Sequence, residues 1–249
     1  MKISLKLLTI SAIISAATNS HAAPDLMGLK LGMTEAEVVN VIKTHNPKMT
    51  IEKTSSAFSS TPSFLRKIYA HTSNIVPVNG SELDAFIIDF AGGPNQSIAM
   101  KIERNVSLRY TTPTTADKLI SAMQGKYGKE ASGYNDGRRI NFSWAYDAKK
   151  PCKSVERFVG IFHESSESAW RNVNNLKTGS AAIQDTSACG IVLILETIAS
   201  PTGIIDSYKY TIMDAGGFEK NMYAQQKWVK SLTDDANNKI KGTATTPKI

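Results

Sequence analysis

Hydrophobic and polar residues alternate with period two along several stretches, which predicts half-buried β-strands. The clearest stretch follows the turn Asn135-Asp136-Gly137 and sets four large apolar side chains on one side: Ile140, Phe142, Trp144 and Tyr146. We expect a helix to cover this aromatic side. Further strands are expected at 66–71, 84–90, 98–102, 157–163, 191–195 and 207–213.

Three other stretches carry helical periodicity and helix boundary signals. Thr34-Glu35-Ala36-Glu37 forms a capping box and predicts a helix from 34 to 45, which Asn46-Pro47 ends. A second helix is expected after Pro113, with Thr114 as its cap and Gly128 as its end. The third and longest follows Gly216-Gly217, with an apolar stripe that runs from Phe218 through Met222, Val229, Leu232 and Ala236 to Ile240.

The order of these elements predicts an α+β fold, in which helices pack on one face of antiparallel sheet. Most neighbouring strands are joined by connections too short for parallel crossovers. The helix starts at 34 and 114 suggest two related halves. We therefore divide the chain into a signal peptide at 1–22, an N-terminal half at 23–110, a C-terminal half at 111–241 and a disordered tail at 242–249.

The first residues have the pattern of a secretory signal peptide. Lys2 and Lys6 precede an uncharged stretch at 7–17 that is too short to span a bilayer, and cleavage after Ala22 or Ala23 fits the small residues there. No cysteine lies near the cleavage point, so we expect no lipid anchor. No later segment is apolar enough to cross a membrane. These features predict a soluble protein of the periplasm, or a secreted one.

Composition indicates a folded domain with a modest positive charge. The chain is 41% hydrophobic and has a net charge of +7, which becomes +5 without the two signal-peptide lysines. Its basic residues are interleaved with acidic ones, whereas a nucleic-acid interface needs a clustered basic face. We therefore expect no nucleic-acid partner.

Cys152 and Cys189 are the two cysteines. In an exported protein they are expected to form a disulfide bond, since the compartment is oxidising. A loop of that length would stabilise the fold by about 4 kcal/mol in the chain-entropy account. The alternative, a redox-active pair, usually has closer spacing.

Catalytic, cofactor and metal motifs yield no assignment. His45, His71 and His163 are far apart in the sequence and lack metal-site spacing. Asp89 and Glu196 are acids within strand-like runs, where the expected role is an ion pair or a solvent-facing carboxylate and the alternative is catalysis. We therefore name no catalytic, cofactor-binding or metal residues and expect no cofactor.

The segment from Gly28 to Val38, Gly-Leu-Lys-Leu-Gly-Met-Thr-Glu-Ala-Glu-Val, resembles a helix opening found in small exported bacterial proteins. It is similar to the first helix of the SmpA/OmlA (BamE) outer-membrane assembly lipoproteins and of the β-lactamase-inhibitor protein family. The resemblance implies helices packed on antiparallel sheet and a role in binding other proteins. The chain lacks the lipidated cysteine of the assembly lipoproteins.

The leading functional hypothesis is a non-enzymatic binding protein, whose partner is another protein or a component of the cell envelope. The alternatives are a small periplasmic hydrolase with a dispersed site and a carrier of a small apolar ligand. A deep pocket with convergent polar groups would favour either alternative.

Overall fold

The computed structural model of the chain describes residues 24–56, 63–72, 83–91, 97–108, 113–146 and 190–243. Cys152, Cys189, Ala22, Ala23 and His163 lie outside these ranges, as do the expected strand at 157–163 and residues 244–249. The disulfide and the cleavage site therefore stay predictions.

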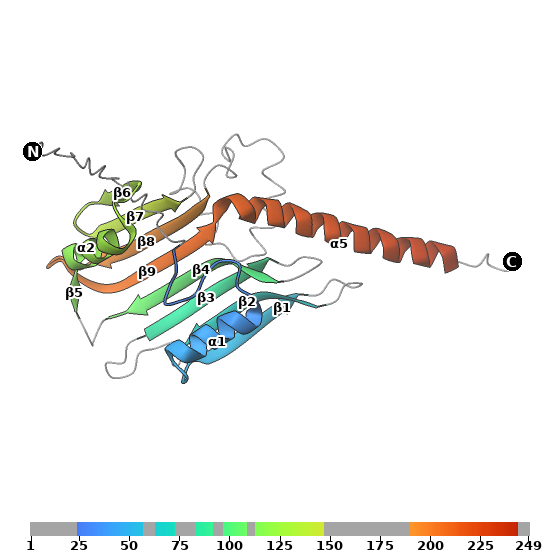
Figure 1. Cartoon of the computed structure of the whole chain (residues 1–249), viewed down its shortest axis with the longest axis horizontal. Coiled ribbons are helices and arrows are strands. Elements are labelled where there is room, and N and C mark those ends of the chain that lie inside the picture. Colours follow the sequence, from blue (N-terminus) through green and yellow to red (C-terminus); the bar gives the residue numbers. More distant parts are fainter. Residues whose placement is uncertain are drawn as a thin grey trace, which may run out of the picture.

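One antiparallel sheet carries the helices (Figure 1). In chain order the elements are α1 (Glu35–His45), β1 (Thr50–Ser56), β2 (Phe64–His71), β3 (Leu83–Ala91), β4 (Ile98–Ser107), β5 (Thr114–Thr115), α2 (Ala116–Tyr127), β6 (Ser132–Asn135), β7 (Arg139–Tyr146), β8 (Ile191–Ala199), β9 (Ile204–Asp214) and α5 (Ala215–Thr243).

The strand order is β1-β2-β3-β4-β9-β8-β7-β6, and the two-residue β5 pairs with β9 beside this path. A helix followed by four strands occurs twice, and β4 and β9, the last strands of the two runs, pair at the centre of the sheet. Helices α1 and α2 lie over the same face (Figure 1). The predicted α+β class is confirmed; that the two runs are related stays a prediction.

The Gly28–Thr34 segment anchors α1 to the sheet. Gly28 and Gly32 have φ angles of 89° and 85°, which a residue with a side chain rarely adopts. The Gly32 amide donates to the Ala99 carbonyl at 2.8 Å, and the Ala99 amide donates to the Met33 carbonyl at 2.8 Å. The predicted capping box is confirmed, since Thr34 and Glu37 exchange hydrogen bonds. The motif behind the family resemblance thus has a structural role here.

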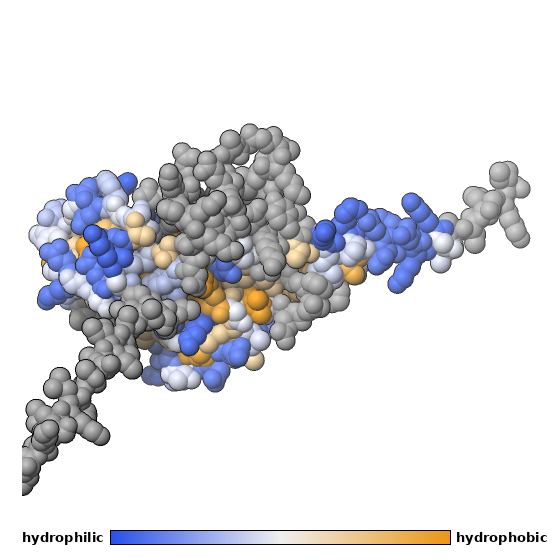
Figure 2. Space-filling model, turned by 45° about the horizontal axis from the view of Figure 1, so that its top comes forward, coloured by the Kyte–Doolittle hydropathy of each residue, from blue (hydrophilic) through white to orange (hydrophobic). Residues whose placement is uncertain are grey.

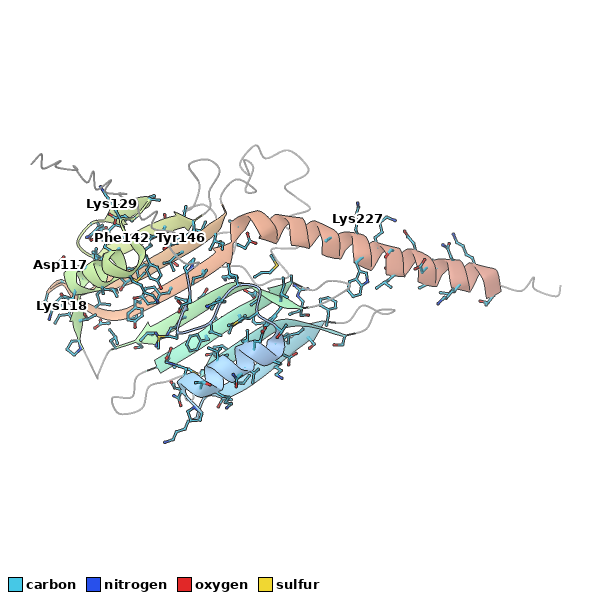
Figure 3. All side chains as sticks on the ribbon, viewed as in Figure 1. Asp117, Lys118, Lys129, Phe142, Tyr146 and Lys227 are labelled. Atoms are coloured by element: carbon cyan, nitrogen blue, oxygen red, sulfur yellow. The ribbon has the colours of Figure 1, made fainter. Side chains whose placement is uncertain are left out.

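Helix α2 covers the aromatic side of β7, as predicted. Phe142 and Tyr146 lie beside this helix (Figure 3), and the Trp144 indole donates to the Gly128 carbonyl at 2.8 Å. Tyr127, at the end of α2, has its ring centroid 6.2 Å from that of Trp144. Burial of these rings against Leu119 and Met123 provides a second packing centre beside that of α1.

The cap of α2 differs from the prediction by one residue. Thr115, rather than Thr114, accepts from the Lys118 amide at 3.4 Å, because Thr114 is drawn into the short β5 pairing with Ile205. The end of the helix at Gly128, with a φ of 78°, is as predicted.

Two edge strands were not predicted. Strand β1 has one apolar residue, Ile51, and strand β6 is Ser-Gly-Tyr-Asn, so neither carries period-two hydrophobicity. Within the described part of the sheet, each pairs with a neighbour on one side only. Polar side chains are common in strands at the edge of a sheet.

Helix α5 follows β9 without a connecting loop. The helix begins at Ala215, and both Gly216 and Gly217 lie inside its first turn. The Gly217 amide donates to Asp214 Oδ1 at 2.6 Å. A β-carbon at Gly217 would collide with that carboxylate. The helix continues to Thr243, two residues into the expected disordered tail. Ile240, the last residue of the apolar stripe, is 68% exposed, so this end of the stripe is not covered. The far half of α5 stands clear of the sheet and is mostly hydrophilic (Figure 2).

Gly133→Ala should destabilise the protein, because the new β-carbon would fall on the Phe142 ring. We expect a loss of about 1 to 3 kcal/mol in the free energy of unfolding, as for other overpacked sites. Gly125→Ala is the control: it lies in α2 with open space around it and should stabilise by about 0.5 to 1 kcal/mol. Urea unfolding measures both, and equal effects would contradict the β6–β7 packing.

Candidate functional site

The register of the sheet separates its side chains into two faces, since residues paired across antiparallel strands point the same way. One face packs against α1 and α2 and holds Ile68, Phe86, Ile102, Ile212 and Leu193 of the core. We call the opposite face the polar face. Its side chains form rows that cross the sheet, and these rows are the candidate functional surface.

Two inner rows lie toward the start of α5 and are mostly buried. They comprise Ala145, Val192, Met213, Lys101, Asp89 and Lys67, and beside them Ser143, Ile194, Thr211, Glu103 and Ile87. Two outer rows lie toward the β8–β9 turn and are more exposed. They comprise Tyr134, Asn141, Glu196, Lys209 and Asn105, and beside them Arg139, Ile198, Ser207 and Ser107.

A charge ladder crosses the inner rows. Lys101 Nζ lies 3.4 Å from Glu103 Oε2 and 3.7 Å from Asp89 Oδ2, and Lys67 Nζ lies 3.8 Å from Asp89 Oδ1. Lys101 and Glu103 are 6% and 7% exposed. Buried charges of opposite sign compensate one another's loss of hydration, so the ladder holds these strands in one register.

Glu103 receives a second set of polar contacts from the outer rows. Asn105 donates to Glu103 Oε1 at 2.9 Å. Burial alone would raise the pKa of Glu103, but the charges of Lys101 and Lys209 and the Asn105 hydrogen bond outweigh it and lower that pKa. The carboxylate is therefore ionised at neutral pH.

Glu196 and Lys209 form the ion pair of the outer rows, with 2.6 Å between Oε2 and Nζ. Asp89 and Glu196, the two strand acids noted in the sequence, are thus both paired with lysines. The expectation of a paired carboxylate is confirmed for each.

A hollow of about 550 Å3 opens over the outer rows, across β6, β7, β8 and β9. Its lining includes Tyr134, Arg139, Asn141, Glu196, Ile198 and Lys209. Tyr134 and Ile198 are 52% and 57% exposed, so the hollow is open to solvent. It combines an ion pair on its floor with an aromatic ring, an aliphatic side chain and a guanidinium group around it.

The β6–β7 turn fixes one side of the hollow. Asp136 accepts from the Arg139 amide at 2.6 Å, from the Arg138 amide at 2.9 Å and from the Tyr134 hydroxyl at 2.7 Å. These hydrogen bonds lower the pKa of Asp136 to about 2. The Asp136 carboxylate is thus ionised, and it is held by hydrogen bonds within the turn.

A second polar cluster lies on the helix side of the sheet. Arg104 donates to both oxygens of Asp84, at 2.9 and 2.8 Å, and His45 Nε2 lies 2.9 Å from Asp84 Oδ2. Phe86 packs against both the His45 ring and the Arg104 guanidinium, with its ring centroid 5.5 Å from each. The cluster joins the end of α1 to β3 and β4, so His45 forms a long-range contact.

The sequence signals for the hollow were weak. The alternation along β7 placed Arg139 and Asn141 on the side opposite the aromatic residues, and this was the signal in the sequence that pointed to the hollow. Lys209 and Ile198 join them only through strand pairing, and β6 with Tyr134 was not predicted.

His71 pairs with Glu52 at 3.4 Å and does not approach His45. Within the described ranges, no group of three or more His, Cys, Asp or Glu side chains is arranged to hold a metal ion. None of the described helices combines the length and apolar composition needed to cross a membrane.

Comparison with known proteins finds no matching family model, no similar curated protein and no similar solved structure. The resemblance of Gly28–Val38 to two exported protein families stays an expectation.

The Glu103 ladder predicts a pH-dependent stability. A carboxyl whose pKa is lowered in the folded state stabilises the fold above its ordinary pKa near 4.5 and loses that contribution as the pH falls. Glu103→Gln should therefore cost about 2 kcal/mol at pH 7, where Lys101 loses one of its charged partners, and clearly less at pH 3.

Urea unfolding at the two pH values measures this difference. Asp117→Asn, at an exposed acid in the first turn of α2 (Figure 3), is the control and should change stability by less than about 1 kcal/mol. An equal cost of Glu103→Gln at both pH values would contradict the ladder.

Proposed function

We propose that this protein is an exported, non-enzymatic binding protein, which takes another protein or an envelope component onto the outer rows of its polar face. The observation that carries the proposal is the hollow over β6 to β9, where Tyr134, Ile198 and Arg139 surround the Glu196–Lys209 ion pair. Tyr and Arg are the residue types that contribute most often to binding energy at protein interfaces.

The support lies in the contrast between the two faces. The helix side is filled by the core, and Val38, Ile42 and Leu119 of the helices are buried on it. On the polar face the inner rows are buried and internally paired, whereas Tyr134 and Ile198 in the outer rows each expose more than half of their surface. Large exposed side chains on a rigid, register-locked sheet suit docking of a preformed surface.

The hollow suits this function better than transport of a small apolar ligand. A carrier site is usually concave, closed and mostly apolar. Here the floor is an ion pair between Glu196 and Lys209, and an apolar ligand would remove its charges from water without replacing their hydration.

The second candidate, a hydrolase, would begin from the His45–Asp84 pair, in which an acid could orient a base. Two contacts favour a structural role for it. Asp84 is held by both donors of Arg104, and among the described residues no hydroxyl or thiol is hydrogen bonded to His45. A nucleophile needs such a contact to be activated.

The proposal can be tested by site-specific photo-cross-linking in the mature protein. p-Benzoylphenylalanine is placed at Asn141 in the outer rows, or at Ser121 on the exposed side of α2 as the control. In extracts of the source organism's envelope, Asn141 should give an adduct of defined mass that unlabelled protein competes away, and Ser121 should not.

Charge reversal provides the second arm. Lys209→Glu places two acids on the floor of the hollow and should reduce the adduct from Asn141 at least about tenfold, because like charges oppose docking. Lys118→Glu on α2 should leave it unchanged. Adducts of equal yield from both positions, or hydrolase turnover that His45→Asn abolishes, would contradict the proposal.

A further inference from the structure

The outer rows contain Arg139, a cation that forms no salt bridge with the described residues, although its charge helps to lower the pKa of Asp136. Glu196 is neutralised by Lys209, and Asp136 is committed to the β6–β7 turn by two amides and a hydroxyl. In the part of the chain that the structure describes, the exposed Arg139 side chain forms no ion pair with either acid. The hollow therefore presents one guanidinium group available to a ligand carboxylate, which Arg binds with two parallel hydrogen bonds.

Apolar surface lies next to this cation. Arg139 is paired in register with Ile198, which is 57% exposed, and Tyr134 occupies the neighbouring row with its hydroxyl turned to Asp136. The Tyr134 ring and the Ile198 side chain thus flank Arg139 on the same face of the sheet. A matching ligand carries a carboxylate beside an apolar group.

Strand β6 indicates that this ligand is a segment of polypeptide. Among the described strands, Ser132–Asn135 is the last of the sheet at this end and pairs with β7 alone, and all four residues are exposed. Its other edge presents unpaired backbone amides and carbonyls, to which an extended segment can add as a further strand. Alternate side chains of that strand would then face the hollow.

We infer that the partner presents an extended acidic segment, with apolar residues beside its acids, which lies along β6 and places a carboxylate on Arg139. This inference rests on the proposed function, since it names the chemistry of the partner that docks on the polar face. The Glu196–Lys209 pair on the floor contributes no net charge, so Arg139 sets the preference for acid.

The test uses three fluorescein-labelled peptides of eight residues, in which Val alternates with Glu, Gln or Lys. Fluorescence anisotropy with the mature protein should show saturable binding of the Glu peptide. The Gln and Lys peptides should bind at least about tenfold more weakly, as the loss of one charge-assisted contact implies. Equal affinity for the Glu and Gln peptides would overturn the inference.

Two arginine variants locate the contact. Arg139→Gln should weaken the Glu peptide about tenfold, whereas Arg138→Gln, at the exposed neighbour in the turn, should change its affinity less than about twofold. Unchanged urea midpoints show that both variants are folded. Equal effects of the two variants would attribute binding to general charge and contradict a site at Arg139.

A competition arm separates a peptide segment from a small acid. Free glutamate at the same concentration should not displace the Glu peptide, because it lacks both the flanking apolar groups and the strand backbone. Full displacement would identify the hollow as a small-carboxylate site and overturn the inference.

Failure of this inference is distinguishable from failure of the proposed function. A cross-link from Asn141 that persists undiminished in Arg139→Gln would mean that the polar face binds its partner without this contact. Absence of any adduct from Asn141 would instead reject the proposed function itself.

Discussion

The pairing of β4 with β9 is the interaction on which the rest of the structure depends. It joins two runs of one helix and four strands through seven paired residues, from Lys101 opposite Met213 to Ser107 opposite Ser207. Because the period of a strand is two, a shift of one residue in this pairing would move every side chain of one run to the other face. The two packing centres under α1 and α2 share one sheet for this reason, and rows of side chains cross the molecule without a break.

Hydrophobic packing fixes this register from the helix side, and charge pairing fixes the adjoining β3–β4 register from the polar face. On the helix side, Ile102 and Ile212 are fully buried and pair directly. On the polar face, Lys101 of β4 pairs with Asp89 of β3, and a slip between these two strands would leave buried charges without their cross-strand contact at a large cost. The inner rows are buried and internally paired, so the exposed outer rows and their hollow are the part of this face on which the proposed partner would dock.

Local signals were enough to predict the elements that carry strong periodicity or a cap. The Thr34–Glu37 capping box and the aromatic alternation along β7 both involve residues close in sequence, and both were correct. Three features had no local sequence pattern that could predict them, because they depend on partners up to dozens of residues away. They are strand β1, strand β6 and the Arg104–Asp84–His45 cluster. The hollow belongs to this second class, because β6 to β9 meet only through strand pairing. Ile240 shows the reverse case, since helical spacing predicts a stripe but does not supply a surface to cover it.

The most direct measurement of the central claim, one continuous sheet in this register, is a disulfide between β4 and β9. The Leu108 amide donates to the Asp206 carbonyl at 2.7 Å, so Ser107 and Ser207 form a directly opposed, non-hydrogen-bonded pair, the closest kind in antiparallel sheet. After oxidation and proteolysis of the Ser107→Cys, Ser207→Cys variant, mass spectrometry should find the two positions linked, whereas Ser107→Cys with Lys209→Cys should stay reduced at these positions. A link in the second variant and none in the first would contradict the register and the polar face built on it.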